Sequence, residues 1–165
     1  MFEKIKNAMK RHTDNCVTIY SPLEGEAVPI SEVNDPVFRE ELVGRGVAVR
    51  PSKGRAVAPA DGEVSMMFKT GHAVVLVLAN GVELLIHVGL DTVNLEGTFF
   101  KIYVRNNDRV RKGDLLIEFD IESIKSEGYD LITPVVVTNH ENFKYVETMA
   151  GHRVAEGDEL ISVRV

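Results

Sequence analysis

Short apolar runs rich in β-branched residues recur along this chain, and Gly, Pro, Asn or Asp interrupts them every few residues. Runs of this length that are bounded by turn residues are typical of β-strands. Two further segments, 36–42 and 120–127, have the pattern of single helical turns, and Asp120 is placed to cap the second. The pattern predicts an all-β fold with a few short helices. The predicted strands cover residues 17–20, 47–49, 55–57, 62–68, 73–79, 82–88, 115–119, 134–138 and 160–165.

Two internal repeats indicate that the architecture is duplicated. Residues 21–26 (SPLEGE) are similar to 58–63 (APADGE), and residues 109–117 (RVRKGDLLI) are similar to 153–161 (RVAEGDELI). Each repeat is a tight turn with a glycine where φ can be positive, next to an apolar strand. Repeated turn–strand units of this kind predict an antiparallel β-sandwich or flattened β-barrel closed on itself.

The composition fits a single soluble domain. Of the 165 residues, 44% are hydrophobic, which is enough for one core without disulfides. Cys16 is the only cysteine in the sequence, so an intramolecular disulfide is impossible and a reducing compartment fits. No apolar run approaches the roughly 18 residues of a membrane span, and the N-terminus lacks the pattern of a secretory signal. We therefore expect a cytoplasmic protein.

The net charge of −6 is unevenly distributed. Residues 1–12 carry four basic side chains and one acidic one, so the rest of the chain is strongly acidic. An acidic body argues against nucleic acid as a partner, because phosphate contacts need a basic surface, and it suits partners with a positive face. Residues 1–15 are predicted to be a basic N-terminal segment, either a short helix whose residues 1–12 weakly contact a membrane or a flexible terminus. The folded domain is expected over residues 16–165.

A predicted hairpin carries the most informative chemistry. Asn80-Gly81 lies between two apolar runs, 70–79 and 82–91, and this dipeptide favours a two-residue type I′ turn. In that register Ala79 lies opposite Val82, and the residue numbers of every cross-strand pair sum to 161. His87 is then opposite Val74, and His72 is opposite Gly89, which leaves room beside the His72 ring.

The same register places Thr70, His72 and His87 on one face of the hairpin, because positions two apart along a strand share a face. A three-residue turn would shift the register by one and put the two histidines on opposite faces. A single histidine in an apolar strand is more often a hydrogen-bonded core residue than a functional one. Two that converge beside a hydroxyl indicate a site that carries a phosphoryl group on nitrogen, shares a metal ion, or acts as a base and an electrophile.

Residues 81–93 (GVELLIHVGLDTV) resemble the motif of the enzyme IIA component, glucose family, of the phosphoenolpyruvate-dependent sugar phosphotransferase system (PTS EIIA type 1). The resemblance extends, in family order, over nearly the whole chain from residue 17. Pro36 and Val88 depart from the family pattern, which affects the details of the docking rim and the pairing with a sugar. The other matching segments are 21–25, 35–38, 57–62, 70–73 and 133–136.

This resemblance implies a flattened, duplicated all-β barrel that works as a phosphotransferase component. His87 would receive a phosphoryl group from phospho-HPr on its tele nitrogen and pass it to a cysteine of the IIB domain of a glucose-type sugar permease. His72 would stabilise the phosphoryl group during transfer, and Thr70 would orient a ring by a hydrogen bond. No cofactor is required, although the family allows His72 and His87 to share a zinc ion with a partner protein.

The resemblance also implies a docking surface for HPr, the IIB domain and regulatory protein targets. Its carboxylates would meet an arginine of HPr, and its apolar residues would form a rim around the histidines. The residues that match are Asp35, Val37, Phe38, Leu42, Val43, Phe68, Leu85, Asp91 and Val93.

Three alternative functions belong to other classes. The first is a regulator that binds proteins through the same face without transferring phosphate. The second is a lipoyl or biotinyl carrier, which needs an acceptor lysine at a hairpin tip, whereas this tip is Asn80-Gly81. The third is a zinc hydrolase, which needs a His-x-His pair that the sequence lacks.

Overall fold

The computed structural model describes residues 15–165, so the predicted basic segment lies, except for its last residue, outside the described residues. The described chain is built of strands and a few short helices, which confirms the all-β prediction. The strands are β1 (Cys16–Tyr20), β2 (Gly25–Pro29), β3 (Arg45–Pro51), β4 (Arg55–Val57), β5 (Gly62–Met67), β6 (Ala73–Leu78), β7 (Glu83–His87), β8 (Phe100–Ile102), β9 (Arg109–Val110), β10 (Leu115–Phe119), β11 (Thr133–Val137), β12 (Tyr145–Thr148), β13 (His152–Val154) and β14 (Glu159–Arg164). The helices are η1 (Ile30–Glu32), α2 (Pro36–Arg39), η2 (Ala79–Gly81), η3 (Thr92–Leu95), α3 (Ile121–Ser126) and η4 (His140–Asn142).

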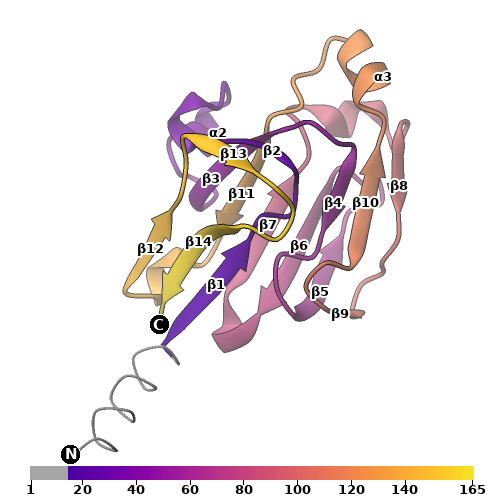
Figure 1. Cartoon of the computed structure of the whole chain (residues 1–165). Helices are drawn as coiled ribbons and strands as arrows, with labels where there is room; N and C mark the ends of the chain where they lie inside the picture. The colour runs from indigo at the N-terminus through magenta and orange to yellow at the C-terminus, as the bar shows by residue number, and fades with distance from the viewer. Residues whose placement is uncertain (1–14) are drawn as a thin grey trace, which may run out of the picture.

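The strands form three antiparallel sheets. One sheet has eight strands in the order β13-β2-β3-β11-β7-β6-β5-β9, and the other two have three strands each, β1-β14-β12 and β4-β10-β8. Figure 1 shows β1, β14 and β12 at one side of the view and β4, β10 and β8 at the other. The eight-stranded sheet ends in the separate edge strands β13 and β9, so its hydrogen bonding does not close into the barrel that we considered beside a sandwich.

The sheet order confirms the duplication indicated by the sequence repeats. The strands that contain the sequence repeats lie at equivalent places in the eight-stranded sheet: β2 and β5 are each second from an end, and β13 and β9 are the two edges. The repeated turns also match in detail: Asp114 Oδ2 accepts from the Arg111 amide, and Asp158 Oδ2 accepts from the Ala155 amide, both at 2.8 Å. The chain is therefore two similar halves related by an approximate two-fold axis.

Apolar side chains pack on both faces of the eight-stranded sheet. The larger cluster lies between this sheet and the two smaller sheets and includes Val47, Leu84 and Ile86. The smaller cluster covers the opposite face and includes Ala48 and Leu85. Burial on both faces explains why the central strands have continuous apolar sequences rather than alternating ones.

The sequence predicted each strand that has a long apolar run and missed five others. The missed strands β2, β8, β9, β12 and β13 are short or contain exposed polar residues, so no apolar run marks them. Both predicted helical turns are present, although α2 ends at Arg39 rather than at residue 42. The Asp120 cap is confirmed, because its carboxylate accepts from the Ser123 amide at 3.1 Å.

The β6–β7 hairpin has the predicted turn with one additional residue. Asn80 and Gly81 both have positive φ, 58° and 74°, as a type I′ turn requires. The Val82 amide donates to the Ala79 carbonyl at 3.3 Å, which closes the turn. The next bond to the Val82 carbonyl, however, comes from Leu78 at 2.8 Å rather than from Ala79. One residue therefore bulges out before the turn.

The predicted hairpin register was consequently wrong by one residue. His87 lies opposite Ala73, not Val74, and the observed register pairs Leu76 with Leu84 inside the larger core cluster. A one-residue shift was expected to separate the histidines, yet they remain together. Because β6 begins at Ala73, His72 precedes the strand, and the strict alternation of faces does not apply to it.

Among residues 15–165, we find no helix that has both the length and the apolar character needed to span a membrane.

Candidate active site

His87 is held by the turn that follows β7. Its Nδ1 atom is 2.7 Å from the carbonyl oxygen of Gly89. Because a carbonyl can only accept, Nδ1 carries the ring proton and donates a hydrogen bond to that oxygen. Gly89 has a φ of 75°, and a Cβ atom there would lie 2.6 Å from Thr92 Cγ2 and 2.9 Å from the Asp130 carbonyl. The turn therefore requires glycine for its conformation and its close packing, and the predicted role of Gly89 in leaving space beside His72 was wrong.

His72 lies at the end of the turn between β5 and β6. Its Nδ1 atom makes a short hydrogen bond with Thr70 Oγ1, which is the contact predicted for Thr70. The carbonyl of His72 accepts from the amide of Val88 at 2.7 Å, immediately after His87. The two histidine-bearing turns are thus joined by their backbones, and the site does not rely on side chains alone.

The two imidazoles face each other inside an aromatic frame. Their centroids are 5.0 Å apart and their planes are nearly perpendicular, at 82°. The ring of Phe38, from α2, lies 5.1 Å from the His87 ring, and the ring of Phe68 lies 5.4 Å from the His72 ring. Two aromatic rings therefore restrict how far either imidazole can turn.

Burial keeps both imidazoles neutral at physiological pH. Desolvation, followed by repulsion from His87, lowers the pKa of His72 from 6.5 to about 4. Desolvation also lowers the pKa of His87, while the Gly89 carbonyl and the carboxylates of Asp35 and Asp91 oppose that shift. A neutral imidazole with its proton on Nδ1 has a free lone pair on Nε2, which is the form that can act as a nucleophile.

The predicted docking residues divide into an exposed rim and a buried support. Val37, Leu42 and Val93 are 43%, 70% and 47% exposed, which is unusual for large apolar side chains around a buried site. Phe38 and Leu85 are buried in the smaller core cluster and support this rim from below, with Val43 and Phe68 half-buried beside them.

The two predicted carboxylates lie close enough to the site to act on His87 electrostatically. Asp35 also caps α2, because its Oδ1 atom accepts from the Val37 amide at 3.0 Å. Asp91 has a left-handed conformation, with a φ of 58°, at the start of η3. Both residues therefore have local structural roles besides their charge.

Met66 extends the exposed rim and was not predicted. It is 48% exposed and pairs with Val75, which packs on the smaller core cluster below the site. A register shift in β5 between Val64 and Met66 brings Met66 to this face of the sheet. The sequence gives no signal for such a bulge, so periodicity could not identify Met66.

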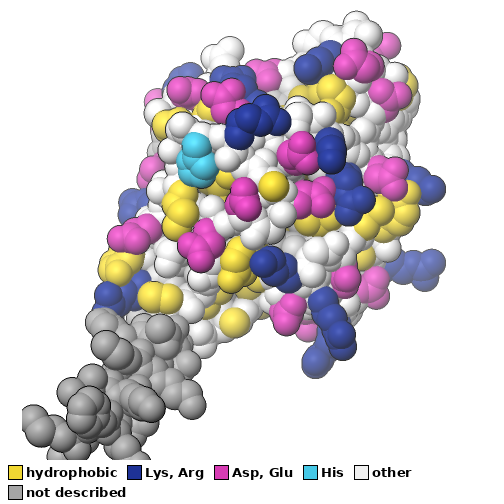
Figure 2. Space-filling model, viewed as in Figure 1, with side chains coloured by type: hydrophobic (Ala, Val, Ile, Leu, Met, Phe, Trp, Pro, Cys, Tyr) yellow, Lys and Arg dark blue, Asp and Glu magenta, His cyan; other side chains and the backbone are white. Residues whose placement is uncertain are grey.

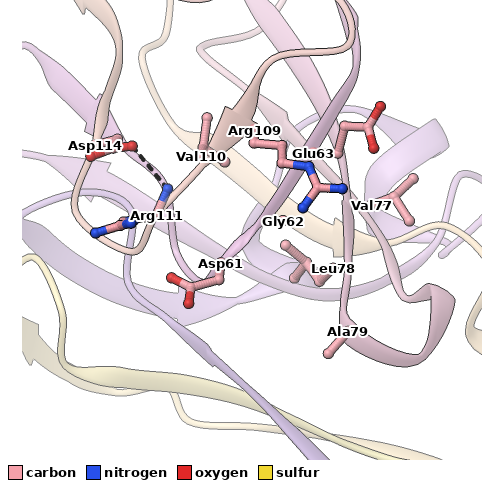
Figure 3. A pocket seen from close by; sticks show the side chains of 10 residues that line it. All are labelled: Asp61, Gly62, Glu63, Val77, Leu78, Ala79, Arg109, Val110, Arg111 and Asp114. Atoms are coloured by element: carbon pink, nitrogen blue, oxygen red, sulfur yellow. Dashed lines mark hydrogen bonds between the residues drawn. The ribbon is translucent and has the colours of Figure 1, made fainter.

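An open hollow of about 710 Å³ lies elsewhere, along β5, β6 and β9. Its wall contains Asp61, Glu63 and Asp114 together with Arg109 and Arg111, and Figure 3 shows Arg109 next to Glu63, its partner across β5 and β9. Acidic and basic side chains are also interspersed over the face seen in Figure 2. The hollow has no histidine in its wall, so its volume alone does not make it the candidate active site. The candidate site is instead the pair of imidazoles of His72 and His87.

Within residues 15–165, no three His, Cys, Asp or Glu side chains come together as a metal site. The histidine pair by itself offers two nitrogen ligands, whereas a zinc site takes at least three ligands from protein.

Residues 17–143 match the family model of the phosphoenolpyruvate-dependent sugar phosphotransferase system, EIIA 1. This chain belongs to that EIIA family. The matched range contains both histidines, and the family gives the chain its function as a phosphocarrier component of a sugar phosphotransferase system. The sequence resemblance and the phosphotransferase assignment are therefore confirmed.

Relatives of this EIIA chain include single-domain and multidomain proteins. The glucose-specific EIIA component of Oceanobacillus iheyensis is 40% identical over 161 residues, which are 98% of this chain and 97% of that protein. The beta-glucoside-specific EIIBCA component of Dickeya chrysanthemi is 49% identical over 137 residues, which are 83% of this chain but only 22% of that protein. Among solved structures, the glucose permease IIA of Mycoplasma capricolum matches with a TM-score of 0.82 and 30% identity, covering 89% of this chain and 95% of that one.

We predict that His72 makes the stability of the protein depend on pH in an identifiable way. His72 is only 4% exposed, and its pKa is about 4 in the folded state against about 6.5 in the unfolded state. The unfolded state therefore binds the extra proton first as the pH falls, and the free energy of unfolding should decrease between pH 6.5 and pH 4, by about 3 kcal/mol in all. Well above pH 6.5, where His72 is neutral in both states, it should no longer make the free energy of unfolding depend on pH.

Urea denaturation of the wild type and of His72→Gln at pH 7 and pH 4.5 measures this contribution. Carboxylates titrate in both proteins, so the difference between their slopes isolates His72. Equal slopes in the two proteins would contradict the prediction.

Proposed function

We propose that His87 accepts a phosphoryl group on Nε2 from phospho-HPr and transfers it to a cysteine of the IIB domain of a sugar permease. The observation that carries this proposal is the hydrogen bond from His87 Nδ1 to the Gly89 carbonyl, which leaves Nε2 as the free nitrogen. The second imidazole, 5.0 Å away between ring centroids, favours a site for a migrating anion over an isolated core histidine.

His72 stabilises the phosphoryl group, and Thr70 fixes the form of His72 that can do so. In this proposal the Thr70 hydroxyl donates to His72 Nδ1, which leaves the proton of the neutral ring on His72 Nε2. That N–H group is a donor for a phosphoryl oxygen. Preorganised donors of this kind act where charge develops during transfer, and they need no reorganisation at the moment of reaction.

The transfer consists of two balanced displacements. In the first, the His87 Nε2 lone pair forms a bond to phosphorus while the bond to the donor breaks, and the donor keeps that electron pair. In the second, a cysteine thiolate attacks phosphorus, and the P–N electron pair returns to His87. The proton stays on His87 Nδ1 through both steps, and its hydrogen bond to the Gly89 carbonyl stabilises the positive charge of the phosphorylated ring.

The rim around the histidines supports docking of two successive partners. Val37, Leu42, Met66 and Val93 can be covered by either partner, which excludes water from the phosphoryl group. The negative charge near His87 suits a basic residue on the donor. Because the relatives act in sugar uptake, we place the protein on the cytoplasmic side of the membrane, where the IIB domain would be its acceptor.

A zinc ion shared with a partner remains a prediction for a complex. The Nε2 atoms of His72 and His87 would provide two ligands, and a partner carboxylate the others. Zinc measured in the purified protein alone should therefore be sub-stoichiometric, and tight retention by the isolated chain would contradict this arrangement.

We predict that incubation with phosphoenolpyruvate, enzyme I and HPr adds an acid-labile, alkali-stable phosphate to this protein. His87→Ala should abolish the label because the nucleophile is lost. His72→Gln should still accept phosphate but pass it on slowly, on the order of a hundredfold, because it lacks a transition-state donor. Labelling that survives His87→Ala would disprove the assignment.

The docking rim predicts a different kinetic signature. Leu42→Asp and Val93→Asp should raise the KM for phospho-HPr on the order of tenfold, since each puts a charge into an apolar interface. Both side chains are largely exposed and neither carries a group that can act on phosphorus, so the kcat should change little. Val165→Asp is a matched control, because Val165 is also an exposed aliphatic residue, at 38%, but follows β14 in a different sheet from the histidines. A control as impaired as the rim variants would argue against the rim.

A further inference from the structure

Thr92 is a buried polar side chain that contacts the turn that holds His87. It is fully buried, and its hydroxyl donates to the carbonyl of Val88. Its methyl group occupies the place beside Gly89 where a Cβ atom would otherwise stand. Thr92 therefore contacts the two residues that directly follow His87, and its hydroxyl bonds to the backbone rather than to the imidazole.

The Gly89 carbonyl is fixed by its own peptide unit and by the unit before it. The Leu90 amide, which shares a peptide plane with that carbonyl, donates to the Asp130 carbonyl at 2.9 Å. The preceding unit contains the Val88 carbonyl, which the Thr92 hydroxyl holds. With both units held, the direction of the Gly89 carbonyl is determined, and this direction decides whether Nδ1 of His87 has a partner.

We propose that Thr92 is a positioning residue that sets the Nδ1-protonated tautomer of His87 through the Val88–Gly89 turn. This inference rests on the proposed function, because it explains how Nε2 is kept free to accept the phosphoryl group. Thr92 acts only through the backbone and makes no contact with the phosphoryl group.

Removal of the Thr92 hydroxyl leaves the Val88 carbonyl without its side-chain partner in a buried turn. A buried carbonyl strongly favours regaining a hydrogen bond, so the turn should rotate. Rotation would weaken the bond between the Gly89 carbonyl and His87 Nδ1. His87 should then populate both neutral tautomers, and the Nε2-protonated one cannot attack phosphorus.

The test compares Thr92→Val, which keeps the shape and loses the hydroxyl, with Thr92→Ser, which keeps the hydroxyl. Ser21→Ala is the matched control, because Ser21 is equally buried and its hydroxyl also donates to a backbone carbonyl, that of Leu23 at 2.6 Å. Nitrogen-15 NMR of the imidazoles reports the tautomer of His87 without any partner protein. Thermal denaturation and the rate of phosphate uptake from phospho-HPr are measured on the same samples.

We expect Thr92→Val to shift His87 towards a mixture of tautomers and to slow phosphate uptake on the order of tenfold. Thr92→Ser should retain the wild-type tautomer and most of the rate, and Ser21→Ala should lose stability while His87 is unchanged. A Thr92→Val protein that is destabilised but keeps the Nδ1-protonated His87 would overturn the inference. Failure of the wild type to take up phosphate would instead refute the proposed function, and the NMR result would still decide the role of Thr92.

Discussion

Burial of both faces of the central strands is the constraint on which the rest of this structure depends. The larger core cluster fixes which residues of β6 and β7 point inward, and the alternation of side chains then sends Leu85 and His87 to the opposite face. That face has its own, smaller apolar cluster, so a histidine placed there is desolvated rather than left in water. The chemistry of the imidazole is thus a consequence of how the sheet is packed.

The site combines an apolar floor with directional polar contacts at each ring. Phe38 contacts the ring of His87, and each imidazole uses Nδ1 for a fixed partner, the Gly89 carbonyl in one case and the Thr70 hydroxyl in the other. Loss of water lowers both pKa values, and the local hydrogen bonds orient both rings and fix the tautomer of His87. In the function that we propose, two chemically identical side chains thereby take different roles, one as an acceptor of phosphate and the other as a donor of a hydrogen bond.

The sequence predicted the fold class, the strands with long apolar runs and the convergence of the two histidines. It misplaced the hairpin register, because the Asn80-Gly81 signal specifies the turn but not the bulge before it. The histidines nevertheless converge, since His72 leaves the strand alternation just before β6 starts. Met66 could not be found for a related reason, because a backbone irregularity in β5 determines which way it faces. Local sequence signals therefore identify the chemistry better than they identify the exact strand register.

The approximate two-fold symmetry of the chain has a consequence for stoichiometry. In β6, Ala73 lies opposite His87, and its counterpart in β3 is Gly46, which lies opposite Val136 of β11. The position that corresponds to the histidine in the other half is thus filled by a fully buried valine of the smaller core cluster. One half of the duplicated fold supplies the histidine that we propose as the phosphate acceptor, and the other supplies part of the apolar floor beneath it. Under the proposed function this symmetric scaffold would load phosphate in one half only, because the equivalent position in the other half has no nitrogen to accept it.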